Sequence, residues 1–157
     1  MTPVNDDNRP VLIAYDGSDF AKTAITDAAD QLGAGRKAVV LTVWEQLEEM
    51  PFLGIRGVAA DPEAVATVIA ETKAGAEHVA REGAELASAA GFDARAEVAG
   101  GDPAWRQIVE LAEEQDASLI VLGSRGRSGL SYVLLGSVAA SVAQHSKRSV
   151  LISHSRA

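Results

Sequence analysis

The stretch that decides the fold reads Leu119-Ile-Val-Leu-Gly-Ser-Arg-Gly-Arg-Ser-Gly-Leu-Ser-Tyr-Val-Leu-Leu-Gly-Ser137. It opens with four apolar residues in a row, which is typical of a strand covered by helices on both faces. Gly123 ends this strand, Gly136-Ser137 opens a helix that starts near Ser137, and the Ser137 side chain is suited to cap it. Glycine lets the backbone approach a ligand closely, and the free N–H groups of a first helical turn attract phosphate. The stretch therefore predicts a strand, a phosphate-binding loop and a helix, although a plain turn before a helix cap would show the same local pattern.

Outward from this stretch, four further segments have the pattern of strands. Val11–Tyr15 is continuously apolar, and Lys37–Val43 and Ser149–Ser153 are similar with fewer apolar residues. Ala94–Val98 alternates between apolar and charged residues, as a half-exposed edge strand does. We therefore expect five strands.

Helical patterns separate these strands. One helix follows Ser18, a suitable N-cap, and stops at Gly33 or Gly35. A second spans the alanine-rich segment Pro62–Ala90, and a third starts at Asp102–Pro103, with the carboxylate as N-cap and proline at the first helical position. Strands that alternate with helices predict one parallel sheet with helices on both faces.

Ligands of such sheets bind beyond the carboxyl ends of the strands, where the strand order reverses. This rule selects the loops after Tyr15, after Val43 and after Leu122. Arg125 and Arg127 add positive charge beside the third loop. A phosphate-bearing ligand is therefore expected at this edge of the sheet.

Composition narrows the class of protein. The length of 157 residues suits one domain, and a formal net charge of −8 argues against broad binding to nucleic acid or anionic membranes. The chain has no cysteine, which removes disulfides and thiolate chemistry. The polar N-terminus lacks the apolar core of a signal peptide, and no apolar run approaches the ~20 residues that cross a bilayer. We therefore expect a cytoplasmic protein with no nucleic-acid or membrane partner.

The long connection from Trp44 to Asp61 carries apolar residues among glycines. Connections of this length are commonly functional. A lid or partner surface and a loop collapsed onto its own domain are both open interpretations.

Three motifs together are more specific than any one of them. Gly123-x2-Gly126-x9-Gly136-Ser137 matches the pattern G-x2-G-x9-G-[ST], and the run Val11–Tyr15 leads into Asp16-Gly17-Ser18. Gly101-Asp102-Pro103 stands before the third helix. With these motifs the chain resembles, over nearly its whole length, the ATP-binding branch of the universal stress protein family.

The resemblance implies a Rossmann-like α/β fold of the adenine nucleotide alpha hydrolase type, a five-stranded parallel sheet in the order 3-2-1-4-5 with helices on both faces. It implies a flexible tail over residues 1–9 and a universal stress protein domain over residues 10–157. It also implies binding of ATP with Mg²⁺, the metal held mainly by the phosphates. The nucleotide-binding positions that it implies are Ala14, Tyr15, Asp16, Val43, Leu122, Gly123, Arg125, Gly126, Gly136, Ser137 and Val138.

Three of these positions have alternatives. Asp16, which is also a candidate Mg²⁺ ligand, would equally suit an Asx-turn or helix cap, and Val43 would equally suit the ordinary core. Tyr15 is bulkier than the residue usual at its place in the family, and its ring is expected to crowd or stack on a purine. The family often has proline where this chain has Ser149, so the expected homodimer contact through Ser149–Ser153 departs from the family pattern.

The expected function is that of an ATP-binding regulatory protein of the stress response, acting as a homodimer with an unidentified regulatory protein partner. Two other functions stay open: a slow ATPase or phosphotransferase, and an interaction module that binds no nucleotide. Efficient hydrolysis needs a positioned water and charge stabilisation. Arg125 is a candidate for the charge, but no base is evident, so we name no catalytic residue and expect at most very slow hydrolysis.

Overall fold

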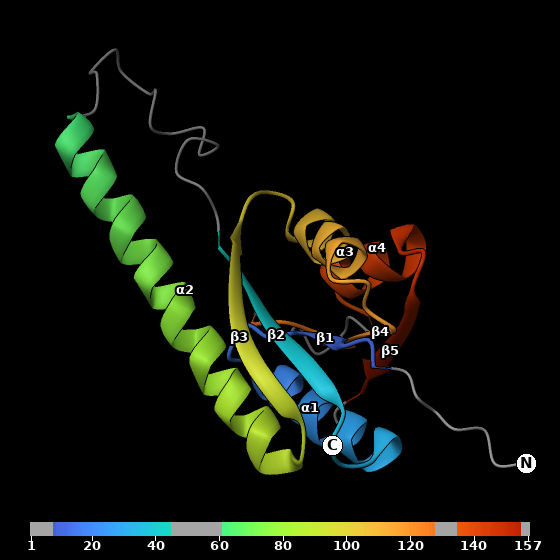
Figure 1. The fold of residues 1–157 in the computed structure, drawn as a ribbon. Coiled ribbons are helices and arrows are strands. Elements are labelled where there is room, and N and C mark those ends of the chain that lie inside the picture. Colours follow the sequence, from blue (N-terminus) through green and yellow to red (C-terminus); the bar gives the residue numbers. More distant parts are fainter. Residues whose placement is uncertain (1–7, 45–60, 128–134, 155–157) are drawn as a thin grey trace, which may run out of the picture.

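The computed structural model describes residues 8–44, 61–127 and 135–154. Most of the expected tail over residues 1–9 and all but the ends of the connection from Trp44 to Asp61 lie outside this part of the chain. Nine elements follow one another in alternation (Figure 1). They are β1 (Val11–Ala14), α1 (Asp19–Leu32), β2 (Lys37–Trp44), α2 (Pro62–Ala90), β3 (Asp93–Gly100), α3 (Ala104–Glu114), β4 (Leu119–Gly123), α4 (Ser137–His145) and β5 (Ser149–Ser153).

All strand pairs of the sheet are parallel, and the strand order is β3-β2-β1-β4-β5. The predicted architecture and strand order are confirmed. From β1 the chain moves outward to β2 and β3 and then returns to place β4 on the other side of β1. The strand order therefore reverses between β1 and β4, which is where such sheets bind their ligands.

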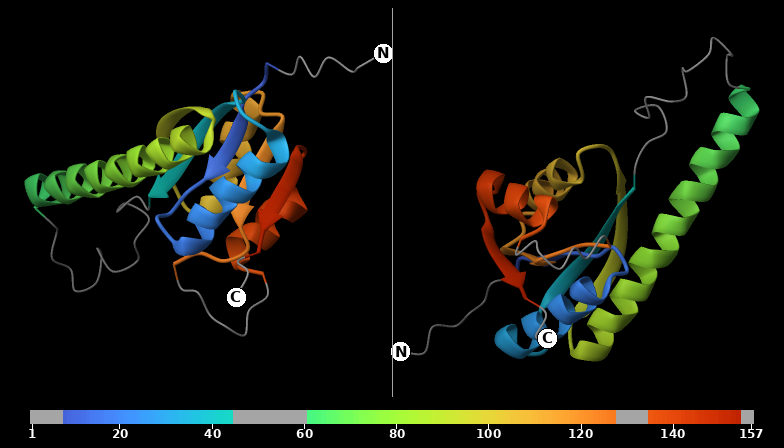
Figure 2. Two further views of the ribbon diagram at one scale, coloured as in Figure 1. Left: turned by 90° about the horizontal axis from the view of Figure 1, so that it is seen from below. Right: turned by 180° about the vertical axis from the view of Figure 1, so that it is seen from behind.

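The sheet divides the core into two layers (Figures 1 and 2). Side chains of α1 and α2 pack with Val11 and Ile13 of β1 on one face. Side chains of α3 and α4 pack with Leu12 on the other face. Each of these three strand side chains is fully shielded from solvent, and burial of such a side chain is worth about 1.5–3 kcal/mol. Burial on both faces explains why the run at Val11 is continuously apolar.

The ends of α1 follow the sequence signals. Ser18 is the N-cap, and its hydroxyl accepts a hydrogen bond from the N–H of Ala21 at 3.2 Å. Gly33 is the C-cap and takes a positive φ of 78°, which glycine adopts without strain. Both predicted ends of this helix are confirmed, with Gly33 rather than Gly35 at its end.

The start of α3 and the N-cap of α4 each differ from the prediction by one residue. α3 begins at Ala104 with Pro103 as N-cap, so Asp102 is not the cap and proline is not the first helical residue. α4 begins at Ser137 with Gly136 as N-cap, so Ser137 does not cap the helix. In both helices the residue at the cap has extended backbone and no side-chain cap bond.

α2 is the longest helix, and its N-terminal half extends past the sheet (Figures 1 and 2). Its first buried residue is Ala76, in the middle of Pro62–Ala90. Among the described residues, no helix is long and apolar enough to cross a membrane.

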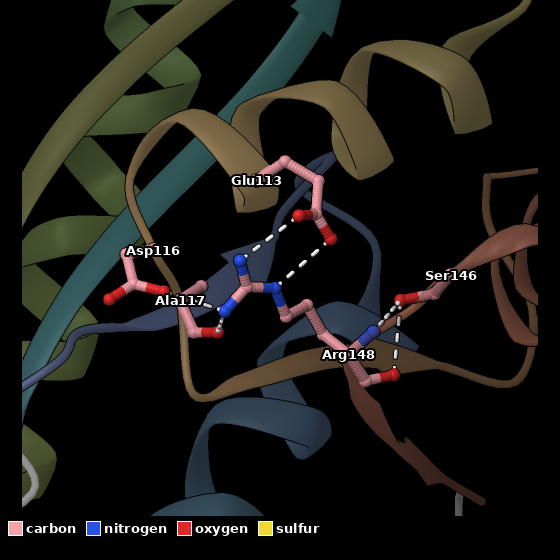
Figure 3. A network of polar contacts seen from close by, with 5 residues as sticks. All are labelled: Glu113, Asp116, Ala117, Ser146 and Arg148. Atoms are coloured by element: carbon pink, nitrogen blue, oxygen red, sulfur yellow. Dashed lines mark hydrogen bonds and ion pairs between the residues drawn. The ribbon is translucent and has the colours of Figure 1, made fainter.

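Arg148 fixes the start of β5 to the end of α3 (Figure 3). Its Nε and Nη2 donate to the two carboxylate oxygens of Glu113, each at 3.0 Å. Its Nη1 donates to Asp116 Oδ1 at 2.7 Å and to the Ala117 carbonyl at 3.2 Å. The Ser146 hydroxyl accepts from the Arg148 N–H at 2.9 Å. These bonds join the segment that leads into β5 to the segment that leads into β4, so the two strands enter the sheet side by side.

Candidate functional site

A cavity of about 340 Å³ opens at the reversal of strand order, at the carboxyl ends of β1, β2 and β4. All eleven positions named from the sequence lie on its wall. β1 and the residues after it contribute Ala14, Tyr15 and Asp16, β2 contributes Val43, and β4 with its following loop contributes Leu122, Gly123, Arg125 and Gly126. The start of α4 contributes Gly136, Ser137 and Val138. The fold therefore brings together residues from four separate parts of the chain.

Asp16 forms the Asx-turn that was one of its predicted alternatives, and it also lies on the wall of the cavity. Its Oδ1 accepts a hydrogen bond from the Ser18 N–H at 2.9 Å, which is an Asx-turn. Its Oδ2 faces Gly126, where an added Cβ would come within 2.9 Å of this oxygen. The Asp16 carbonyl accepts from Arg127 Nε at 2.9 Å. The carboxylate is therefore held in place at the wall of the cavity by its own turn.

The start of α4 forms another part of the cavity wall. The Gly136 N–H donates to the Ser124 carbonyl at 2.6 Å, which ties the helix start to the loop after β4. No side chain caps α4, and Ser137, Val138 and Ala139 all line the cavity. The first N–H groups of a helix have no partner within the helix and carry its positive dipole end. This side of the cavity is suited to an anionic group.

The ring of Tyr15 lies on the other face of the sheet, so the expectation that it stacks on a purine is wrong. The ring packs in the core layer under α1 and α2, where a Cβ on Gly83 would come within 2.6 Å of Tyr15 Cδ1. The Tyr15 hydroxyl donates to Glu82 on α2. Burial, and then the bond to Glu82, raise the pKa of the Tyr15 phenol, while this bond lowers the pKa of the Glu82 carboxyl. Tyr15 reaches the cavity from β1, but its ring does not.

The floor of the cavity is apolar. Val43 and Leu122 belong both to the cavity wall and to the core layer under α3 and α4, so the core alternative for Val43 is confirmed and its nucleotide contact stays a prediction. Ala104 and Ile108 of α3 add to this floor. The sequence carries no motif for this contribution of α3, because only the packing of α3 on the sheet brings its apolar face to the cavity.

Arg125 is a half-buried cation of the wall. Its Nε is shielded from solvent and has no hydrogen-bond partner among the described residues. Its Cζ lies 5.5 Å from the centre of the Phe20 ring, within the range of a cation–π contact. The sequence motifs do not include Phe20, and its proximity to Arg125 depends on how α1 packs beside β4.

The described residues hold no group of three or more His, Asp or Glu side chains that could bind a metal ion. Among the described residues that line the cavity, Asp16 is the one carboxylate. Mg²⁺ in nucleotide sites is typically held by one or two carboxylates together with the phosphates of the ligand. The residues present are compatible with a metal that arrives with the ligand, with Asp16 as the available protein group.

The chain is similar to known proteins over nearly its whole length. The family model "Universal stress protein family" matches residues 7–154. The universal stress protein YxiE of Bacillus subtilis is 36% identical over 154 residues, which cover 90% of this chain and 96% of YxiE. A crystal structure of a universal stress protein in complex with cAMP has a TM-score of 0.59 at 30% identity, covering 93% of this chain and 96% of that one.

Universal stress protein UspA from Lactobacillus plantarum shares the fold, with a TM-score of 0.70 at 22% identity over 92% of this chain and 97% of that one. The strand order and the whole-length match to the family model agree with the motifs that end β1 and β4. This chain therefore belongs to the universal stress protein family.

Proposed function

We propose that this protein binds ATP in the cavity between β1, β2 and β4 and acts as a nucleotide-dependent regulatory protein of the stress response in the cytoplasm. The observation that carries the proposal is that one cavity of about 340 Å³ combines an apolar surface with a positively charged one. Its floor is apolar, and its wall includes the start of α4, which no side chain caps, and the cationic side chain of Arg125. An adenine nucleotide has the same division into an apolar base and an anionic chain. The relative that was crystallised with cAMP supports an adenine nucleotide as the class of ligand.

The residues suit separate parts of such a ligand. Val43 and Leu122 offer apolar surface for the base, and the Asp16 carboxylate faces the cavity for the ribose hydroxyls or for Mg²⁺. The first turn of α4, beginning at Ser137, offers N–H groups to the phosphates. Mg²⁺ would neutralise phosphate charge when it is bound with the nucleotide.

The test is thermal unfolding and calorimetry with and without Mg²⁺ and ATP. A ligand at ~100 times its dissociation constant adds about 2.7 kcal/mol to the free energy of unfolding. For a domain of this size that corresponds to a rise in melting temperature of about 5–11 °C. Mass spectrometry of the protein denatured after mild purification identifies any nucleotide that co-purifies. No heat of binding and no rise in melting temperature at millimolar ATP would refute the proposal.

We infer binding rather than rapid turnover from the position of Asp16. It is the one carboxylate on the described wall of the cavity, and the proposed function places it beside the ribose hydroxyls or Mg²⁺. A general base must lie within hydrogen-bond reach of the water that it activates, so a carboxylate at that place is not positioned to activate a water at the terminal phosphate. A bound nucleotide would then persist and act as a signal.

We also propose that two copies of the chain associate through β5. This strand forms one edge of the sheet and pairs with β4 on its inner side. Its central residues Val150, Leu151 and Ile152 are half-buried, and an edge strand with apolar side chains favours pairing with another chain. Light scattering at micromolar concentration should report a dimer, and Leu151→Pro, which removes a backbone donor from β5, should report a monomer. A monomeric wild type would refute this assembly.

A further inference from the structure

The unpaired Nε of Arg125 needs a physical explanation. A buried donor without an acceptor costs free energy, so some other contact must keep the side chain in this position. Among the described residues, the contact that the structure shows is with Phe20 on α1. The Arg125 Cζ lies 5.5 Å from the centre of the Phe20 ring. The face of an aromatic ring carries partial negative charge and attracts a cation without satisfying its N–H groups.

Phe20 is itself held firmly. It is the second residue of α1, which begins at Asp19 and is capped by Ser18. Its main chain lies against β4: a Cβ on Gly123 would come within 2.9 Å of the carbonyl carbon and oxygen of Phe20. This close approach leaves the first turn of α1 little freedom to move relative to β4. The ring therefore presents a fixed surface to the side chain of Arg125.

The pair stands at the border of two hollows. Arg125 lines the cavity described above, and Phe20 lines a more open depression of about 530 Å³ on the α1 and α2 side. Both hollows include Asp16, Gly126 and Arg127. Arg125 therefore places positive charge at the border of the cavity, beside the residues that the two hollows share.

We propose that Phe20 is a positioning residue for anion recognition. Its ring holds the positively charged Arg125 guanidinium at the rim, so the site favours a phosphate-bearing ligand over the same nucleoside without phosphate. This inference rests on the proposed nucleotide binding. It assigns the selectivity for phosphate to a side chain outside the glycine motif.

The experiment compares the affinities of ATP and adenosine, each with Mg²⁺, by calorimetry. Phe20→Leu keeps the Cβ that packs on Gly123 but removes the ring. Loss of a cation–π contact predicts ATP binding weaker by roughly threefold to tenfold, with unchanged binding of adenosine. Phe20→Tyr keeps the ring face and should bind ATP like the wild type. In an Arg125→Gln background, Phe20→Leu should cause no further loss of ATP affinity.

Each result decides between alternatives. If Phe20→Leu weakened ATP and adenosine binding equally, its role would be structural and the inference would be overturned. The inference would also be overturned if Phe20→Leu weakened ATP binding as much in the Arg125→Gln background as it does in the wild type. An unchanged ATP affinity in Phe20→Leu would also overturn it while leaving the proposed function intact. A wild-type protein that binds neither ATP nor adenosine would instead refute the proposed function. Melting temperatures of all variants, measured without ligand, verify that the comparison is made on folded protein.

Discussion

Gly126→Val should remove ATP binding while the protein stays folded. Gly126 has no positive φ, so its backbone accepts a side chain without strain. An added Cβ would nevertheless lie 2.9 Å from Asp16 Oδ2, closer than the ~3.5–4.0 Å of an ordinary contact. The two methyl groups of valine then extend from a residue on the cavity wall. The expected damage is therefore local to the cavity.

The cost to folding can be bounded from the structure. The atom that must move belongs to the Asp16 side chain, and the bond at risk is the one from the Ser18 N–H to Asp16 Oδ1. One hydrogen bond of this kind contributes about 0.5–1.5 kcal/mol. The melting temperature without ligand should fall by about 1–6 °C. The increase of about 5–11 °C that saturating ATP gives the wild type should disappear.

Gly123→Ala is the matched control, because its added Cβ meets backbone instead of a side chain. That Cβ would lie 2.9 Å from the main chain of Phe20, which cannot rotate away. Overpacking of this kind costs about 1–3 kcal/mol, so this variant should lose more stability than Gly126→Val. Thermal unfolding of the three proteins with and without Mg²⁺ and ATP measures both effects. A Gly126→Val protein with the full ATP response, or one less stable than Gly123→Ala, would refute the reasoning.

Three further predictions address other parts of the molecule. Arg148→Met should lower the melting temperature at pH 7. The Arg148 guanidinium lowers the pKa of Glu113, so the ion pair stabilises the fold above the ordinary glutamate pKa of 4.5. The difference in melting temperature between Arg148→Met and the wild type should therefore become smaller as the pH falls below 4.5. A difference in melting temperature that does not change with pH would contradict this. Tyr15→Phe removes the hydrogen bond to Glu82 on the face away from the cavity, so it should raise the pKa of Glu82, followed by NMR, and leave ATP affinity unchanged. Phosphate release from purified protein should run near ~10⁻⁴ s⁻¹, and a rate of ~1 s⁻¹ that vanishes in Gly126→Val would identify an enzyme.

The sequence predicted the elements well where an apolar pattern ran without interruption. The bounds Pro62–Ala90 of α2 and Ser149–Ser153 of β5 were predicted to the residue. Long periodic segments and buried strands carry their signal in many residues at once, so one atypical residue does not hide it. Helix starts depend on one or two residues, and Gly136 rather than Ser137 became the N-cap because its extended backbone fits that place. A one-residue error of this kind is expected when several residues in a row suit a cap.

The direction of the Tyr15 side chain could not be predicted from the pattern. Side chains alternate along a strand, and Val11, Ile13 and Tyr15 point to the layer of α1 and α2, while Leu12 points to the other layer. In a strand buried on both faces, every position is apolar, so the pattern does not say which set faces which layer. Only the packing of the helices settles it. For the same reason the place of Phe20 could not be predicted, because its position beside Arg125 depends on how α1 packs against β4.

The three glycines of the motif have different neighbours, and this affects what such a motif can predict. Gly123 leaves space for the main chain of α1, Gly126 leaves space for the Asp16 carboxylate, and a Cβ on Gly136 would lie 3.2 Å from the carbonyl of Ser124. Gly123 therefore allows α1 to pack closely on the sheet, and Gly126 allows the Asp16 carboxylate to lie at the cavity wall. Gly136 allows the loop after β4 to approach the start of α4. A match to the motif thus predicts the shape of this edge of the sheet before it predicts a ligand. The chemistry that distinguishes one ligand from another must come from side chains between and beside the glycines, and in this chain the half-buried Arg125, which lines the cavity, is the clearest of them.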